Sequence, residues 1–217
     1  MEHEMIRTAR EYLNIAFVLS FITIVYNIAE GAISTYFGYE DETLALFGFG
    51  TDSFIEVVSA IGIAHMVWRM KRSSVSMRDT FERQALRITG SAFYLLSVGL
   101  LLGAGIAFWQ GTTPITTIVG MFVSLVSIAT MYFLFRYKLK VGKALGSDAI
   151  IADANCTKTC FYLSFILLAS SLLYYMFELP YVDAIGSLGI AWYAFKEGKE
   201  AFENSNSDSL SCCNSSC

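Results

Sequence analysis

Two pairs of side chains that can bind a metal ion lie inside apolar segments, each pair spaced four residues apart. Asp52 and Glu56 form the first pair, and Cys156 and Cys160 form the second. Residues at i and i+4 share one face of a helix. Asp153 falls on the face of the two cysteines and is a fifth candidate ligand. Because ionisable groups inside a membrane are costly and usually mark an ion path, we expect a divalent-cation site where two such faces meet.

The chemistry of these ligands indicates which metal they would bind. Two carboxylates and two thiolates in a tetrahedron suit Zn²⁺. Thiolates favour soft or borderline ions over Mg²⁺, Ca²⁺ and Mn²⁺, so Cd²⁺ fits as well and Fe²⁺ stays open. Both kinds of ligand must lose protons to bind a metal. The sequence therefore predicts Zn²⁺ as a transported ion that is exchanged for protons.

The composition places these pairs in a membrane protein. The chain has 217 residues, of which 55% are hydrophobic and only 16% charged, whereas a soluble domain carries about 25% charged residues. A hydrocarbon core of about 30 Å takes roughly 20 residues to cross. Six segments are long enough, and we predict transmembrane helices near 12–37, 43–69, 84–109, 114–136, 147–174 and 181–198. The expected fold is an all-α membrane protein of six transmembrane helices.

The two pairs lie at matching depth in the predicted helices. Each pair begins about nine residues from the start of its segment, which places it roughly 13–20 Å deep, near the midplane. One shared site requires equal depth. The alternative is structural, since a single buried Asp can satisfy a neighbouring helix and a Cys often packs as a small hydrophobe.

Basic residues indicate the orientation of the helices. Of the 15 Lys and Arg residues, all except Lys158 fall on the side of the two termini. The positive-inside rule then places both termini in the cytoplasm, and we expect the cell (inner or plasma) membrane. Lys158 lies about 200° around its helix from Cys156, which leaves two roles open: pairing with a carboxylate on another helix, or charge compensation at the site.

The chain divides into one large unit and a short tail. We predict a six-helix transmembrane cation-efflux domain over 1–200 and a disordered cytoplasmic tail over 201–217, with no soluble C-terminal domain. The tail ends in the polar, low-complexity run SNSDSLSCCNSSC. Its cysteines, Cys212, Cys213 and Cys217, could capture cytoplasmic metal, or the tail could be without function.

Three further residues have two plausible roles each. Glu30, buried by position, could serve proton access or make a helix-packing hydrogen bond. Asp183 opens the sixth segment, where an acid favours a helix N-terminus, so we expect it to cap a helix. His65 lies near Trp68 and is expected at the membrane interface rather than among the metal ligands.

Several stretches resemble one transporter family, the cation diffusion facilitators. Its second, fifth and sixth helices are similar to LALFGFGTDSFIEVVSAIGIAHMVWRMKR, LGSDAIIADANCTKTC and YVDAIGSLGIAWYAFKEGKEAF. The first helix, with the run YNIAEG at 26–31, is closest to the branch of transmembrane protein 163-type zinc transporters. The resemblance implies a homodimer and a transport site of two residues on the second helix and two on the fifth. Those positions fall on Asp52, Glu56, Cys156 and Cys160.

The sequence departs from that family at the fifth helix. Zinc members usually carry His-x-x-x-Asp there, whereas this chain has Cys-x-x-x-Cys. The cytoplasmic C-terminal domain and the His-rich loop of many members have no counterpart in these 217 residues. The resemblance therefore supports the transport site more firmly than the metal or its regulation.

Three functions compete on these observations. The first is a secondary transporter that exports a divalent metal against protons. The alternative is a membrane metal sensor or scaffold without transport. A membrane redox enzyme is the weakest, because cysteines at i and i+4 are not a C-x-x-C motif and no cofactor motif is visible. We expect no enzymatic activity and no nucleic-acid partner.

Overall fold

The computed structural model describes residues 2–41, 43–70, 78–111, 118–178 and 181–206. These residues form helices and short connections, as an all-α fold requires. The helices are α1 (Glu2–Glu40), α2 (Leu44–Met70), α3 (Arg78–Gln110), α4 (Ile118–Leu145), α5 (Asp148–Phe177) and α6 (Val182–Asn206). Each overlaps one predicted segment. Helix α6 continues past residue 200, where we expected the tail to begin, and 207–217 lie outside the described residues.

Five of the helices, α1 to α5, are long and apolar enough to cross a membrane. Helix α6 falls short of that standard because Lys196, Glu197, Lys199 and Glu200 crowd its C-terminal half. It nevertheless packs along α3, which is one of the five helices long and apolar enough to cross a membrane. The chain is therefore an all-α membrane protein, as predicted from its composition.

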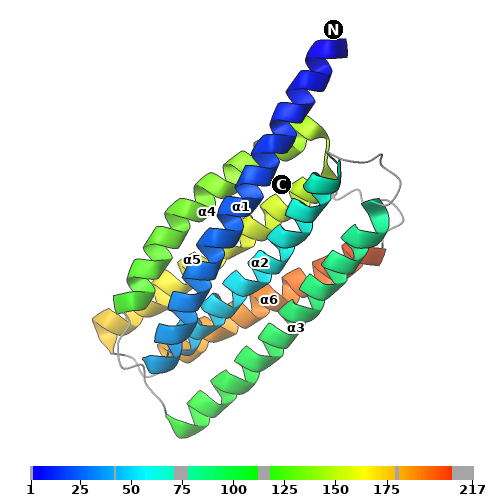
Figure 1. Ribbon diagram of the computed structural model, residues 1–217. Coiled ribbons are helices and arrows are strands. Elements are labelled where there is room, and N and C mark those ends of the chain that lie inside the picture. Colours follow the sequence, from blue (N-terminus) through cyan, green and yellow to red (C-terminus); the bar gives the residue numbers. More distant parts are fainter. Residues whose placement is uncertain (1, 42, 71–77, 112–117, 179–180, 207–217) are drawn as a thin grey trace.

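The helices form three antiparallel pairs, α1 with α2, α3 with α6, and α4 with α5 (Figure 1). Helix α2 lies at the centre, because it contacts α3, α5 and α6 in addition to α1. This arrangement brings α2 against α5, the two helices that carry the predicted metal ligands. The face-to-face meeting expected from the sequence is thus present in the fold.

Glycine lets α1 and α2 approach closely. A β-carbon on Gly50 would lie 2.6 Å from the backbone nitrogen of Thr35, and one on Gly31 would lie 3.1 Å from the carbonyl oxygen of Gly50. Helices in lipid lack a hydrophobic driving force for association, so close van der Waals packing at small residues holds them together instead. The contact fixes how α2 presents its opposite face to α5.

A tight turn sets the register of α4 against α5. Gly146 adopts a left-handed conformation, with φ of 56°, which glycine tolerates without a side-chain clash. Its N–H donates to the Lys143 carbonyl (3.3 Å), and the Ser147 N–H donates to the Gly142 carbonyl (3.0 Å). This is the Schellman pattern that ends many helices. The turn aligns the last turns of α4 with the first turns of α5.

Most of the remaining side chains either pack in an apolar core or lie on the apolar outer surface of the bundle. A core between α2, α3, α5 and α6 includes Leu46, Phe49, Phe93, Leu163 and Ile190. Large apolar side chains are exposed all around the bundle, as a hydrocarbon environment permits. A soluble protein would not expose that much apolar surface.

Candidate metal site

One member of each predicted pair meets the other across the contact between α2 and α5. Cys160 Sγ donates a hydrogen bond to Asp52 Oδ2 at 2.9 Å. Both side chains are buried, with 2% and 1% of their surface exposed. A thiol and a carboxylate from different helices, 108 positions apart in sequence, are therefore direct neighbours.

Glu56 lies one turn further along α2 and meets a residue that sequence reasoning missed. Thr157 Oγ1 donates to Glu56 Oε1 at 2.6 Å. Thr157 also lies within 3.2 Å of the Asp153 carbonyl oxygen, on its own helix. One turn beyond Glu56, Ser59 Oγ donates to Asp153 Oδ1 at 3.4 Å. Polar contacts thus occur at three successive levels along α2 and α5, over about two helical turns.

Lys138, on α4, contacts this row of polar side chains on α2 and α5. Its place in the basic run that follows the predicted segment 114–136 indicates the cytoplasmic side of the membrane, but the structure buries Lys138 at 1% exposure. Its Nζ lies 2.9 Å from Asp153 Oδ2 and 3.7 Å from Glu56 Oε1, and it donates to Thr157 Oγ1 at 2.8 Å. A buried ammonium is stable only when paired in this way. Lys138 is therefore part of the site and not a surface charge.

The two cysteines do not occupy equivalent places. Cys160 is buried beside Asp52, whereas Cys156 is half-buried and packs against the apolar core of α2, α3, α5 and α6. The fully buried polar stripe of α5 includes Asp153, Thr157 and Cys160, at the spacing of one helix face. Cys156 lies at the edge of that stripe.

Among the described residues, no three His, Cys, Asp or Glu side chains are grouped closely enough to hold a metal ion. Four of the five predicted ligands are instead engaged in hydrogen bonds and in the ion pairs of Lys138, whereas Cys156 packs against the apolar core. Two buried oxygens, Asp52 Oδ1 and Glu56 Oε2, accept no hydrogen bond within the described part of the chain. Buried polar atoms without partners are rare in native proteins and need an explanation such as an ion.

A second polar cluster joins α1 to α2. Tyr26 donates to Glu30 Oε1 at 2.7 Å, and Ser53 donates to Glu30 Oε2 at 2.9 Å. Both oxygens of this buried carboxylate therefore have partners. Of its two predicted roles, the helix-packing hydrogen bond is the one these contacts support.

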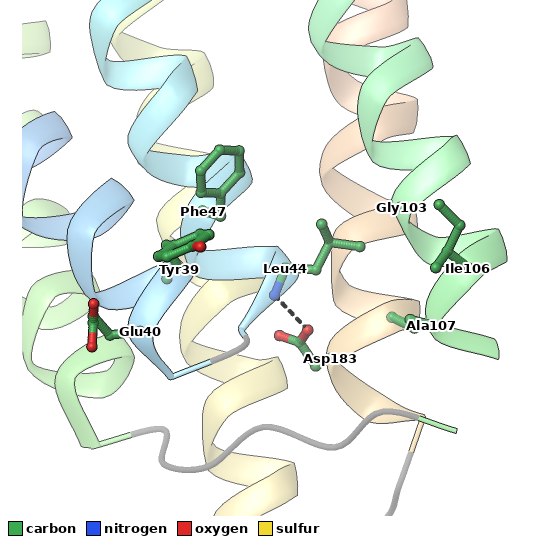
Figure 2. A pocket seen from close by; sticks show the side chains of 10 residues that line it. Tyr39, Glu40, Leu44, Phe47, Gly103, Ile106, Ala107 and Asp183 are labelled. Atoms are coloured by element: carbon green, nitrogen blue, oxygen red, sulfur yellow. Dashed lines mark hydrogen bonds between the residues drawn. The ribbon is translucent and has the colours of Figure 1, made fainter. Parts of the chain in front are cut away.

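Asp183 caps a helix, although not its own. Its carboxylate accepts hydrogen bonds from the backbone N–H groups of Leu44 (2.7 Å) and Ala45 (3.2 Å), in the first turn of α2 (Figure 2). Beside it lies an open pocket of about 580 Å³ between the ends of α1 and α3 and the starts of α2 and α6. Its lining includes Tyr39, Glu40, Phe47, Gly103 and Ile106.

The other singled-out residues lie at the surface or outside the described residues. Lys158 is exposed, with its Nζ 5.7 Å from the centre of the Tyr162 ring, so it faces away from the site as predicted. His65 is also exposed, with its ring 6.2 Å from that of Trp68. Cys212, Cys213 and Cys217 belong to the segment that is not described.

Comparisons with known proteins agree with this picture. Residues 15–208 match the family described as the cation efflux transmembrane domain. The chain is 26% identical to the manganese efflux system protein MneP of Bacillus subtilis over 202 residues, which cover 88% of this chain and 68% of that protein. It is also 26% identical to the uncharacterized transporter YdbO of the same organism, over 75% of this chain and 59% of YdbO.

An archaeal protein is similar to the same extent. The uncharacterized transporter MJ0449 of Methanocaldococcus jannaschii is 29% identical over 78% of this chain and 61% of its own length. The chain thus spans about three fifths to two thirds of the curated relatives it matches. These matches confirm the predicted superfamily, while the transmembrane protein 163-type branch stays a prediction.

Proposed function

We propose that this chain, which belongs to the family of cation efflux transmembrane domains, exports a divalent transition-metal cation from the cytoplasm in exchange for protons. The observation that carries the proposal is the contact between α2 and α5. There, Asp52 and Glu56 each keep one buried carboxylate oxygen without a partner in the described residues, and a thiol lies 2.9 Å from Asp52. These are metal-binding groups at membrane depth on two facing helices.

The hydrogen bonds of this arrangement correspond to a proton-loaded form of the site. Cys160 holds its proton toward Asp52, and Thr157 donates its own to Glu56. A metal ion that binds between α2 and α5 replaces the thiol proton, because the ligand is the thiolate. Completing four ligands with both cysteines requires Cys156 to leave its place against the apolar core. Metal and protons thus compete for one set of atoms.

Zinc is the first candidate for the transported ion. A site with sulfur ligands favours Zn²⁺ and Cd²⁺ over hard cations. Manganese is the second candidate, because the similar protein MneP is named as a manganese efflux protein. Mn²⁺ suits carboxylate ligands, so a manganese site would rely on Asp52 and Glu56 and leave both thiols protonated. Flux of the two ions therefore reports whether the cysteines are ligands.

We further propose that both termini face the cytoplasm of a cell (inner or plasma) membrane. The exposed Lys140 and Lys143 end α4, Lys196 and Lys199 lie near the end of α6, and Arg87 lies near the start of α3. The alternating directions of the helices put these positions at one end of the bundle (Figure 1). Positive charge at one end supports that end as cytoplasmic.

A homodimer is the proposed assembly, as the family resemblance implied. Helix α3 offers a suitable surface, since Leu95, Leu102 and Trp109 on it are exposed. In a membrane that surface is covered by lipid or by a second copy. Particle mass in nanodiscs distinguishes the two, and a strictly monomeric particle would argue against the dimer.

Metal flux into liposomes tests the proposed function. We expect the Asp52→Ala variant to fall to background flux of Zn²⁺, Cd²⁺ and Mn²⁺ under a pH gradient while it still inserts and folds. The matched control is Glu203→Gln, which removes an exposed acid on α6 and should leave flux unchanged. Flux of Asp52→Ala equal to that of the unaltered protein would overturn the site. Metal binding without flux in the unaltered protein would instead support a sensor or scaffold.

A further inference from the structure

Lys138 has a complete set of partners inside the bundle. An ammonium group carries three protons, and its Nζ has three neighbours: Asp153 Oδ2 at 2.9 Å, Thr157 Oγ1 at 2.8 Å and Glu56 Oε1 at 3.7 Å. The neighbouring Lys140 and Lys143 on α4 are exposed. Lys138 is turned inward because it falls on the buried stripe of α4, with Met131, Leu134 and Val141.

The carboxylates around Lys138 differ in how much binding capacity they retain. Asp153 uses both oxygens, one for Lys138 and one for Ser59. Glu56 has partners only at Oε1. Its contact with the Lys138 ammonium is longer, at 3.7 Å, and the Thr157 hydroxyl bonds both groups. Of the carboxylates at the contact between α2 and α5, Asp52 and Glu56 each keep one buried oxygen without a partner among the described residues. The capacity to bind a further cation therefore lies on α2 and not on Asp153.

We infer that Lys138 is a tethered counter-cation that sets the metal affinity of the site, and that Asp153 is its ion-pair partner instead of a metal ligand. The inference rests on the proposed function. Three carboxylates and one ammonium share the contact between α2, α4 and α5, while the nearby Glu30 has both oxygens bonded to Tyr26 and Ser53. Once Lys138 neutralises Asp153, Asp52 and Glu56 carry the two negative charges that match one divalent cation. Lys138 is thus a positioning residue, since it acts through Glu56 and Asp153.

The same contact explains how bound metal could leave. An ammonium 3.7 Å from Glu56 repels a cation bound to that carboxylate, and repulsion between charges is strong where water is excluded. A transporter must bind its ion firmly enough to take it up and weakly enough to release it. Lys138 lowers affinity, and its removal should produce tighter binding with slower release.

A double-mutant cycle separates the two roles of Asp153. The variants are Lys138→Gln, Asp153→Asn and the two combined, with Lys140→Gln as the matched control on the exposed face of α4. Zn²⁺ dissociation constants are measured in nanodiscs at one pH by competition with a fluorescent chelator. We expect Lys138→Gln to tighten binding about tenfold or more and Asp153→Asn to weaken it to a similar degree. The combined variant should return to within about threefold of the unaltered protein.

The outcomes distinguish the inference from its alternatives. If Asp153 is a ligand, losing it costs more affinity than Lys138→Gln regains, so the combined variant binds Zn²⁺ more weakly than the unaltered protein by well over about threefold, and the inference is overturned. Unchanged or weaker binding by Lys138→Gln would also overturn it. Where a single variant fails to fold, the combined variant decides, because it leaves no unpaired charge. If the unaltered protein binds Zn²⁺ but shows no flux, the proposed transport fails while the cycle still holds. If it binds no metal, both fall.

Discussion

At the residue scale, the contact between Asp52 and Cys160 carries the most chemistry. It joins a hard and a soft candidate ligand across two helices, with the thiol donating to the carboxylate. A thiol has an ordinary pKa near 8.5 and is mostly protonated at neutral pH. We therefore expect a metal ion that binds Cys160 to displace its proton.

Sulfur should matter more for Cd²⁺ than for Zn²⁺, and more at Cys160 than at Cys156. We expect Cys160→Ser to weaken Cd²⁺ binding by about tenfold or more, equivalent to about 1.4 kcal/mol, and Zn²⁺ binding less. Cys156→Ser should act in the same direction but more weakly, because Cys156 packs against apolar neighbours. Competition binding on both variants checks this. If both bind Cd²⁺ as tightly as the unaltered protein, the cysteines are structural.

The candidate ligands can be predicted from the sequence, but the side chains that form hydrogen bonds and ion pairs with them cannot. Asp52 and Glu56 were recognisable because acids stand out in an apolar run. Lys138 was grouped with surface charges because it lies near other basic residues, although its seven-residue spacing from the buried Met131 placed it on the inner stripe of α4. Thr157 gave no signal by itself, since threonine is common in membrane helices and its partner lies 101 positions away.

At the element scale, the start of α2 depends on α6. The first N–H groups of a helix have no partner within the helix, and here Asp183 accepts from two of them. A cap supplied by a distant helix ties α6 to the ligand-bearing α2. Asp183 lies in the first turn of α6, as predicted from the sequence, whereas its hydrogen bonds to α2 could not be predicted because they join segments about 139 positions apart.

Removing this cap should destabilise the bundle. We expect Asp183→Ala to cost about 1 kcal/mol, the usual loss for a helix cap, and Asp183→Asn to cost less because an amide oxygen still accepts a hydrogen bond. Thermal unfolding in detergent, followed by the helical signal, measures the difference. Glu40→Ala, an exposed acid of the same pocket, is the control and should unfold with the unaltered protein. An equal melting temperature for Asp183→Ala would contradict the role of the cap.

The helices themselves were largely predictable, and their ends were not. Long apolar runs leave a membrane chain little choice except helix, because backbone groups in lipid must bond within their own segment. The helices extend beyond the apolar runs at several ends, as α1 does toward Glu2 and α4 toward Leu145. Hydropathy marks where lipid begins, whereas turns such as the one at Gly146 decide where a helix ends.

At the scale of the whole molecule, α2 is the helix that connects the three pairs of helices. It contacts α1, α3, α5 and α6, and it carries both candidate carboxylates. A shift of α5 along or around α2 changes the spacing of Asp52 and Cys160 while the α1–α2 contact stays intact. We expect alternating access to use this contact, since the glycines that bring α1 and α2 together leave little room for sliding.

At the same scale, we expect proton exchange, because the proposed metal ligands also bind protons. We expect Zn²⁺ binding to release protons between pH 6 and 8, because a thiol with an ordinary pKa near 8.5 is mostly protonated there and metal binds the thiolate. Lower pH adds protons that compete for the same atoms, so affinity should fall as pH falls. Calorimetry in buffers of different ionisation enthalpy counts the protons.

Cys160→Ser provides the matched comparison for that count. A serine hydroxyl does not ionise in this pH range, so the variant should release about one proton fewer per metal. Glu203→Gln, which alters only an exposed acid, should release as many as the unaltered protein. Zero protons released by the unaltered protein at every pH would break the coupling, even if Asp52 proved to be a ligand. Equal counts for Cys160→Ser and the unaltered protein would assign the released protons to the carboxylates, and metal would then bind beside a thiol that keeps its hydrogen.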